Sequence, residues 1–302
     1  MSVVPPLPDD QLLREEMIRP FGLGLKLRIW GDPHKPLVLL QHGGKDHGRS
    51  WDWTVEALRT DYCLAVPDLR GHGDSENPLG GGYDTVDMVA DMAAIVEHLE
   101  AQGQTMPIHV VGHSWGGNLA LNFAAALPNR VRSVVSIEGL GFSQDRYDQL
   151  VNKPMAARMG EAVQRRLTVA KRKPRVFETQ EEGMKRLVAL HPQLAQEQAE
   201  HLARHALRPC SEGWAWKHDP AMGFMPVRPS PPSEYGQVYR EIRAPVLLMY
   251  GRDSWATSPK DDGRMDMFTN AELIEFENAG HWLHHDQFTD FIGALRRFLE
   301  RH

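Results

Sequence analysis

The stretch that decides the fold is IHVVGHSWGGNLALNFAAAL, residues 108–127. Its first four residues, Ile108-His109-Val110-Val111, are rich in β-branched side chains and predict a strand. The apolar run from Asn118 to Leu127 predicts a helix. Between them lies Gly112-His113-Ser114-Trp115-Gly116. A strand, a sharp turn and a helix are the context in which G-x-S-x-G presents a serine hydroxyl at the end of a sheet. We therefore predict that Ser114 is a nucleophile rather than a simple helix cap.

The same alternation of short apolar runs and helical periodicity continues on both sides of this stretch. It predicts a mostly parallel, doubly wound α/β sheet with helices on both faces. After Glu138 the alternation stops for about a hundred residues rich in helix formers, and it resumes at Pro245. Because ligands of open α/β sheets bind at the carboxyl edge, we expect this insertion to cap the site. The expected organisation is a lead-in at 1–19, a core at 20–139 and 244–302, and a helical cap at 140–243.

Two further motifs follow early predicted strands, His42-Gly43-Gly44 and DLRGHGDS at residues 68–75. Together with the serine motif, they resemble the α/β-hydrolase superfamily with an inserted helical cap. The resemblance covers residues 20–138 and 244–302. It implies an oxyanion hole formed by the backbone N–H groups of Gly44 and Trp115. We interpret the histidines inside the motifs, His42, His72 and His113, as structural turn residues.

A serine hydroxyl needs a neighbouring base to take its proton. The superfamily places that histidine in a loop after the last strand, and Gly280-His281-Trp282 matches this position. We therefore predict His281 as the base. His284, His285 and Asp286 lie close by, but adjacent side chains point apart, so we predict neither a metal site nor any cofactor.

Two carboxylates compete for the role of the acid that orients the histidine. The usual family position, three residues after Gly251, holds Ser254, and Asp253 is one residue early. The alternative is Glu138, at the end of an apolar strand. Haloalkane dehalogenases and zearalenone lactonases resemble this pattern in carrying a glutamate there. We favour Glu138 and keep Asp253 as the alternative acid.

A serine nucleophile distinguishes this chain from dehalogenases and epoxide hydrolases of the same fold, which use aspartate. It fits acyl transfer on a carboxylic ester or lactone through an acyl-enzyme, as in a carboxylesterase or lactonase. A carbon–carbon bond hydrolase with the same serine, and a non-catalytic binding protein of this fold, remain alternatives. In the insertion, Trp214 and Trp216, with Phe224 and Met225, either line an apolar pocket or pack the cap onto the core.

The amino-acid composition limits the classes of partner that the protein can bind. The chain has 302 residues, 41% of them hydrophobic, and a formal net charge of −6, so no broad basic field attracts nucleic acid or an anionic membrane. Two cysteines make no disulfide framework. Because the N-terminus lacks a signal-peptide pattern and no apolar run spans a bilayer, we expect a cytoplasmic enzyme. The expected partner is a small-molecule ester or lactone, and nothing in the sequence indicates an oligomeric state.

Overall fold

The computed structural model describes residues 12–79, 81–171, 175–223 and 227–302. Its centre is an eight-stranded sheet in the order β1-β2-β4-β3-β5-β6-β10-β11. The six strands from β4 to β11 are parallel, while β2 runs antiparallel to both β1 and β4. The predicted mostly parallel sheet is therefore confirmed. The strands are β1 (Leu12–Ile18), β2 (Leu25–Trp30), β3 (Leu37–Gln41), β4 (Cys63–Pro67), β5 (Ile108–His113), β6 (Val131–Ile137), β10 (Val246–Gly251) and β11 (Ala271–Phe276).

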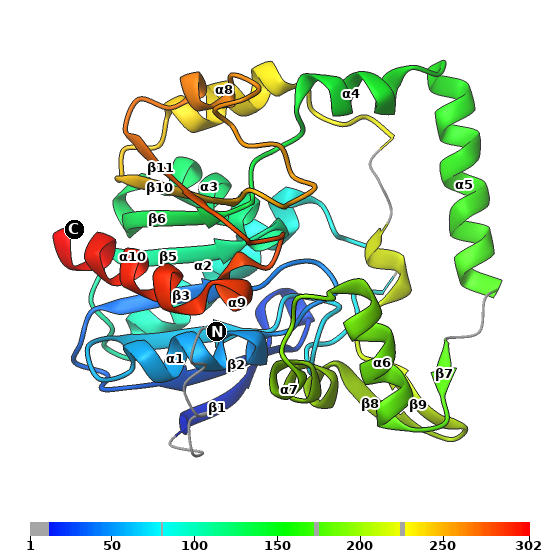
Figure 1. Cartoon of the computed structure of the whole chain (residues 1–302), viewed down its shortest axis with the longest axis horizontal. Helices are drawn as coiled ribbons and strands as arrows, with labels where there is room; N and C mark the ends of the chain where they lie inside the picture. Colours follow the sequence, from blue (N-terminus) through cyan, green and yellow to red (C-terminus); the bar gives the residue numbers. More distant parts are fainter. Residues whose placement is uncertain (1–11, 80, 172–174, 224–226) are drawn as a thin grey trace.

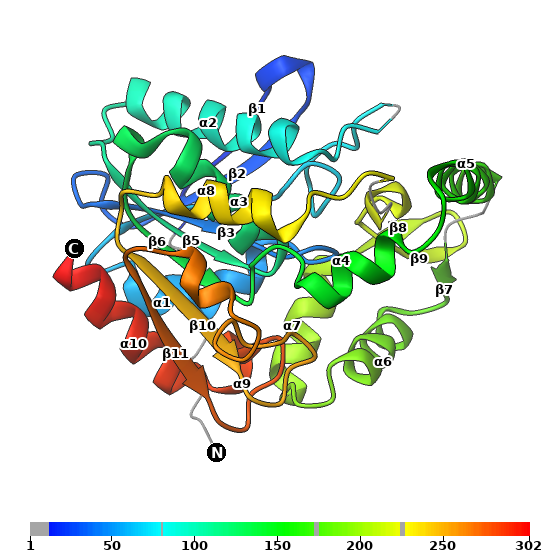
Figure 2. The ribbon, with the colours of Figure 1, turned by 90° about the horizontal axis from the view of Figure 1, so that it is seen from above.

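Helices cover both faces of this sheet (Figure 2). One face carries α1 (Asp52–Leu58), α9 (Leu283–Asp286) and α10 (Phe288–Arg301), and the other carries α2 (Thr85–Ala101), α3 (Trp115–Ala126) and α8 (Pro232–Arg240). Each face has its own apolar core. In β5, Val111 packs into the first core and its neighbour Val110 into the second. This two-sided burial explains why the central strands are continuous apolar runs rather than alternating ones.

Strand β1 lies within residues 1–19, which we expected to be only a lead-in segment. It pairs antiparallel with β2 at the edge of the sheet, so that Glu15 faces Arg28 in the register. Glu15 forms ion pairs with Arg28 and Lys26 across this edge. The charged residues at the centre of β1 suit an exposed edge, and they conceal its strand character in the sequence.

The insertion after β6 extends beyond the carboxyl ends of the parallel strands (Figure 1). It contains α4 (Gln144–Val151), α5 (Met155–Lys171), α6 (Gln180–Leu190) and α7 (Gln196–Ala206), then the short helix η4 (Pro220–Gly223). It also contains a small antiparallel sheet in the order β7-β9-β8, formed by Val176–Phe177, Gly213–Trp216 and Leu207–Cys210. The residue pattern indicated no strand in this segment. These strands have two to four residues, too few to establish an alternating pattern.

Helix α8 falls inside the range 140–243 that we assigned to the cap, but it packs with the core. Its Tyr239 is fully buried, belongs to the apolar core on the α2–α3 face and stacks on Phe268 at 4.6 Å between ring centroids. The Tyr239 hydroxyl accepts the Gly141 N–H at 2.8 Å. Both ends of the insertion are thereby held on the sheet.

Candidate active site

The sharp turn between β5 and α3 places Ser114 in a strained conformation, with φ 53° and ψ −118°. The flanking glycines are required by packing. A Cβ at Gly112 would lie 2.2 Å from the carbonyl oxygen of Gly116, and one at Gly116 would lie 2.4 Å from that of Gln41. Strand, helix and the loop after β3 therefore meet here at backbone contact distance. Strain of this kind persists only where the surrounding structure imposes it.

His281 lies in the loop between β11 and α9 and faces the serine. Its Nε2 is 2.9 Å from the Ser114 Oγ. The His281 carbonyl oxygen is 2.8 Å from Nε2 of His113, whose side chain is fully buried behind the loop. Burial lowers the pKa of His113 well below its usual value, so this ring is neutral and donates from Nε2 to that carbonyl. His113 thus fixes the loop that carries His281.

Glu138 follows β6 and meets the other side of the His281 ring. Its Oε2 lies 2.5 Å from Nδ1 of His281, and its side chain has no exposed surface. Two further donors satisfy the carboxylate: the Gly251 N–H reaches Oε1 at 2.8 Å, and the Ser254 hydroxyl reaches Oε2 at 2.5 Å. Glu138 also adopts a positive φ of 50°. This turn aims its side chain at the histidine rather than along the strand.

Asp253, the alternative acid, is placed differently. Its residue is exposed, and its backbone N–H donates to the Ala279 carbonyl at 2.9 Å. Within the described part of the chain, its carboxylate makes no hydrogen bond or ion pair. The one-residue shift from the usual position therefore turns this carboxylate away from His281. Ser254 occupies that position instead and binds the glutamate.

The two segments that carry the backbone donors predicted for an oxyanion hole, the start of α3 and the Gly43-Gly44 loop, adjoin the serine. Trp115 is the first residue of α3, so its N–H has no partner within the helix. A Cβ on Gly43 would lie 3.2 Å from the Ser114 Cβ, which places the Gly43-Gly44 loop against the nucleophile. A Cβ on Gly44 would lie 3.3 Å from the methyl group of Met222, in η4 of the insertion. The insertion therefore reaches over this loop.

Sequence reasoning assigned no role to three residues at the site. Met222 contacts the oxyanion loop, and Ser254 binds Glu138. The Trp255 indole lies 4.7 Å from the His281 ring between centroids, although 79% of its surface is exposed. The sequence held one usable signal, a serine at the family's usual acid position directly before an aromatic residue. Met222 stands in a segment without a recognisable pattern.

The two tryptophans predicted to bind substrate lie on β9 and are half-buried. Trp216 packs edge-to-face on Phe177 of β7 at 5.3 Å between centroids, and both indoles adjoin the apolar core of the α1–α10 face. Among the described residues, no ring contact or hydrogen bond joins them to Ser114, His281 or Glu138. Their packing role is visible, whereas substrate binding stays a prediction. The other two candidates, Phe224 and Met225, lie outside the described residues.

The remaining histidines near the site have structural partners. The His42 Nε2 accepts the Leu69 N–H at 2.9 Å, and its Nδ1 lies 2.8 Å from the Gly43 carbonyl. His72 lies 2.8 Å from the Arg70 carbonyl. Burial lowers the pKa of His42, and that of His72 to about 3. His284 and His285 pack on Trp51 and Trp53.

Comparison with known proteins identifies the family. Residues 36–288 match the family model of the α/β hydrolase fold. The chain belongs to this family. A serine hydrolase-like protein of Danio rerio is 29% identical over 85% of this chain and 79% of its own length. The pimeloyl-[acyl-carrier protein] methyl ester esterase of Chromobacterium violaceum is 32% identical over 88% of this chain and 94% of its own length.

Solved structures support the same fold. This α/β hydrolase superposes on the thioesterase domain from the curacin biosynthetic pathway with a TM-score of 0.81 and 22% identity. The match covers 94% of this chain and 99% of that one. In the part of the chain that the structure describes, no helix combines the length and apolarity needed to cross a membrane.

Proposed function

We propose that this α/β hydrolase is a serine hydrolase that cleaves a carboxylic ester or lactone by acyl transfer. The observation that carries the proposal is the unbroken set of contacts from the Ser114 hydroxyl through both nitrogens of His281 to the Glu138 carboxylate. A nucleophile, a base and an orienting acid in this geometry are the machinery of acyl transfer. The similarity to a methyl ester esterase supports an ester substrate.

In the proposed mechanism, His281 takes the proton of Ser114 as the Oγ attacks the substrate carbonyl. The negative charge that develops on the carbonyl oxygen is held by the backbone N–H groups of Gly44 and Trp115, at the N-terminus of α3. His281 then protonates the leaving alcohol. Water, activated by the same histidine, hydrolyses the acyl-enzyme and releases the acid.

Glu138 holds the His281 ring in the tautomer that presents Nε2 as a base and stabilises the imidazolium that forms. Ser254 and the Gly251 N–H act through Glu138, because they fix both carboxylate oxygens. We assign Ser254 as a positioning residue. Met222 contacts the oxyanion loop and Trp255 packs on the His281 ring, so we infer that both side chains contact the substrate.

The proposal is tested by hydrolysis of a panel of p-nitrophenyl esters, aliphatic lactones and a vinylogous diketone, each with wild type and Ser114→Ala. We expect Ser114-dependent turnover of esters or lactones. Turnover of the diketone alone would support carbon–carbon bond cleavage. Saturable binding of these compounds without turnover would support a binding protein, and either result would overturn the proposal.

A further inference from the structure

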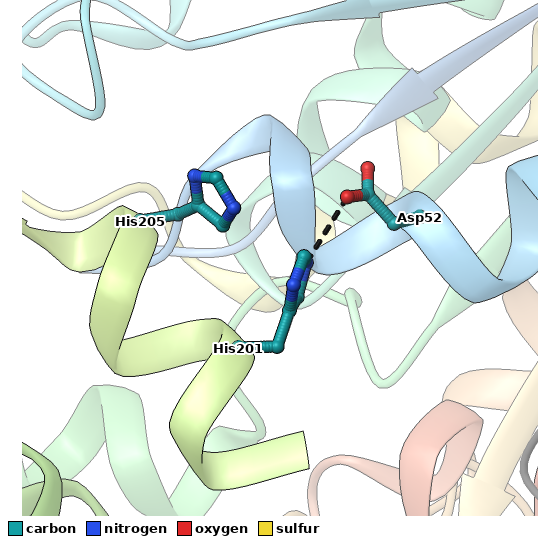
Figure 3. A group of neighbouring side chains, drawn as sticks. All are labelled: Asp52, His201 and His205. Carbon is teal, nitrogen blue, oxygen red and sulfur yellow. Dashed lines mark ion pairs between the residues drawn. The ribbon is translucent and has the colours of Figure 1, made fainter. Parts of the chain in front are cut away.

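Three side chains of metal-ligating type meet away from the proposed hydrolytic site, where α7 packs on the start of α1 (Figure 3). His201 and His205 lie four residues apart on α7, so they share one face of that helix. Asp52 is the first residue of α1. One ligand atom from each residue lies within 4.8 Å of the other two. Among the described residues, this is the one such group of histidine, cysteine and carboxylate side chains.

The Asp52 carboxylate is fully buried but only half satisfied. Its Oδ2 lies 2.6 Å from Nε of Arg49 and 3.0 Å from Nε2 of His201. Its Oδ1 is buried and has no hydrogen-bond partner among the residues that the structure describes. An unpaired oxygen on a buried carboxylate is costly and rare in folded proteins. This oxygen therefore points to a ligand that would satisfy it.

With Asp52, the two histidines form a group of ligand types that zinc-like ions prefer, at distances close to those of a metal site. His205 makes no side-chain hydrogen bond within the described chain and is only half-buried, so a solvent path reaches its ring. Imidazole and carboxylate bind zinc-like ions at about 2.0–2.2 Å, which puts ligand atoms about 3.3–3.6 Å apart in a tetrahedral site. The present 4.8 Å spread is wider than this, so binding requires the side chains to move together by about 1 Å.

We propose that Asp52, His201 and His205 bind a divalent transition metal ion of the zinc class, with water completing its coordination. Nitrogen ligands favour such ions over magnesium or calcium, which prefer oxygen. The site bridges α7 of the insertion and α1 of the core. The bound ion therefore links these two parts more firmly than the hydrogen bonds from His47 to the Leu202 carbonyl and from His201 to the Arg49 carbonyl.

Arg49 competes with the metal ion for the Asp52 carboxylate. Its guanidinium neutralises Asp52, and its side chain is 22% exposed, so it can leave for solvent when the ion enters. Removing this positive charge will strengthen metal binding, since like charges in a partly buried site repel. A different result is expected if Arg49, Asp52 and His201 form a network with a purely structural role. In that case, loss of Arg49 lowers stability and leaves metal affinity unaffected.

The test uses tag-free, chelator-treated protein in the Ser114→Ala background, so that the result does not depend on hydrolase activity. Zn²⁺ is titrated by calorimetry, the thermal midpoint is measured with and without Zn²⁺, and Co²⁺ is followed by its visible absorption. At Zn²⁺ about 100-fold above Kd, we expect the midpoint to rise by about 5 °C. We also expect a Co²⁺ spectrum of low coordination number.

The variants separate a site from incidental binding. His205→Gln, which removes a ligand without removing a hydrogen bond, should leave the metal-free midpoint unchanged and raise the Zn²⁺ Kd by about 100-fold or more. Asp52→Asn should also abolish the shift, whereas Arg49→Gln should lower the Kd at least about tenfold. His34→Gln, at an exposed histidine elsewhere, is the matched control. Equal Zn²⁺ responses in His205→Gln and His34→Gln, or weaker binding in Arg49→Gln, would overturn the proposal.

Discussion

Glu138 accepts three hydrogen bonds, from Gly251, Ser254 and His281, and its carboxylate leaves no oxygen unused. These hydrogen bonds hold the carboxylate in one orientation, and the carboxylate in turn orients the His281 imidazole. The neighbouring Asp253 is exposed, and among the described residues its carboxylate makes no hydrogen bond to His281. At the residue scale, the proposed catalytic apparatus therefore depends on one glutamate.

Glu138→Gln removes the negative charge and offers His281 an amide in its place, which favours the wrong tautomer. We expect kcat on an ester substrate to fall by about 10⁴-fold, with little change in KM. Asp253→Asn is the matched control and should keep most of the activity. Steady-state kinetics of both variants show which of the two carboxylates acts as the acid. A larger loss of kcat in Asp253→Asn than in Glu138→Gln would refute the role of Glu138.

Ser254 offers a rescue experiment. Its Oγ lies 2.5 Å from the Glu138 oxygen that contacts His281, so an aspartate at 254 brings a carboxylate close to the ring. We expect Ser254→Asp to restore kcat at least about tenfold in the Glu138→Gln background. In the wild-type background it should lower kcat, because two carboxylates then compete for one site. No rescue in the double variant would mean that position 254 does not reach the base.

Much of this residue-scale arrangement could be predicted from the sequence. Ser114 and His281 follow from motif and chain order. The acid stayed ambiguous because its direction depends on a positive φ at Glu138, which no residue pattern reports. Met222 and Trp255 were missed because contacts across the insertion depend on tertiary packing.

At the scale of elements, the junction of β3, β5 and α3 builds the proposed site. Gly116→Ala puts a methyl group 2.4 Å from the Gln41 carbonyl and 2.5 Å from that of His42. The loop carrying Gly44 must then move away from the serine. If the variant folds, we expect kcat to fall by about 10²–10³-fold, the cost of losing one oxyanion donor. Circular dichroism checks that the variant folds, and ester kinetics measure its kcat. Near-normal turnover would contradict the assignment of the Gly44 loop to the oxyanion hole.

Gly160 of α5, unlike Gly116, has room for a side chain. It lies in the helix interior, and a methyl group added to it would have no neighbour within 4 Å among the described residues, apart from its own helix backbone. We expect Gly160→Ala to increase the free energy of unfolding of this helix by about 0.5–1 kcal/mol, through helix propensity alone. Thermal denaturation and ester turnover should show a small rise in stability and unchanged kcat. A loss of stability would show that the α5 backbone needs glycine here.

The central strands could be predicted because two-sided burial leaves uninterrupted apolar runs such as Val110 and Val111 of β5. The strands that were missed are of two kinds. Edge strand β1 is charged at its centre, and β7, β8 and β9 are too short for periodicity. Their pairing depends on neighbours distant in the sequence.

At the scale of the whole molecule, buried neutral histidines make stability depend on pH. Burial lowers the pKa of His72 and His285 to about 3, and that of His109 and His218 to about 4. Between about pH 4 and 6.5 the unfolded chain therefore binds more protons than the folded one. The stability from these groups is present above about pH 6.5 and is lost as the pH falls. Asp46 and Asp286 oppose them, because burial raises the pKa of Asp46 to about 7 and that of Asp286 to about 6.

The protons that the four histidines take up on unfolding outnumber those that the two aspartates release in this window. We expect the thermal midpoint to drop by about 5 °C or more between about pH 6.5 and 5.5. Scanning calorimetry in buffers of matched ionic strength measures the dependence. A midpoint that stays flat or rises over this fall in pH would show that these histidines are protonated in the folded protein.

Covalent labelling with a fluorophosphonate, followed by intact-mass and peptide mass spectrometry, directly tests whether Ser114 is an activated nucleophile. We predict a single adduct per chain, located on Ser114, absent in Ser114→Ala and strongly slowed in His281→Ala. Failure of the wild-type protein to react, or an adduct on another residue that persists in Ser114→Ala, would contradict the account.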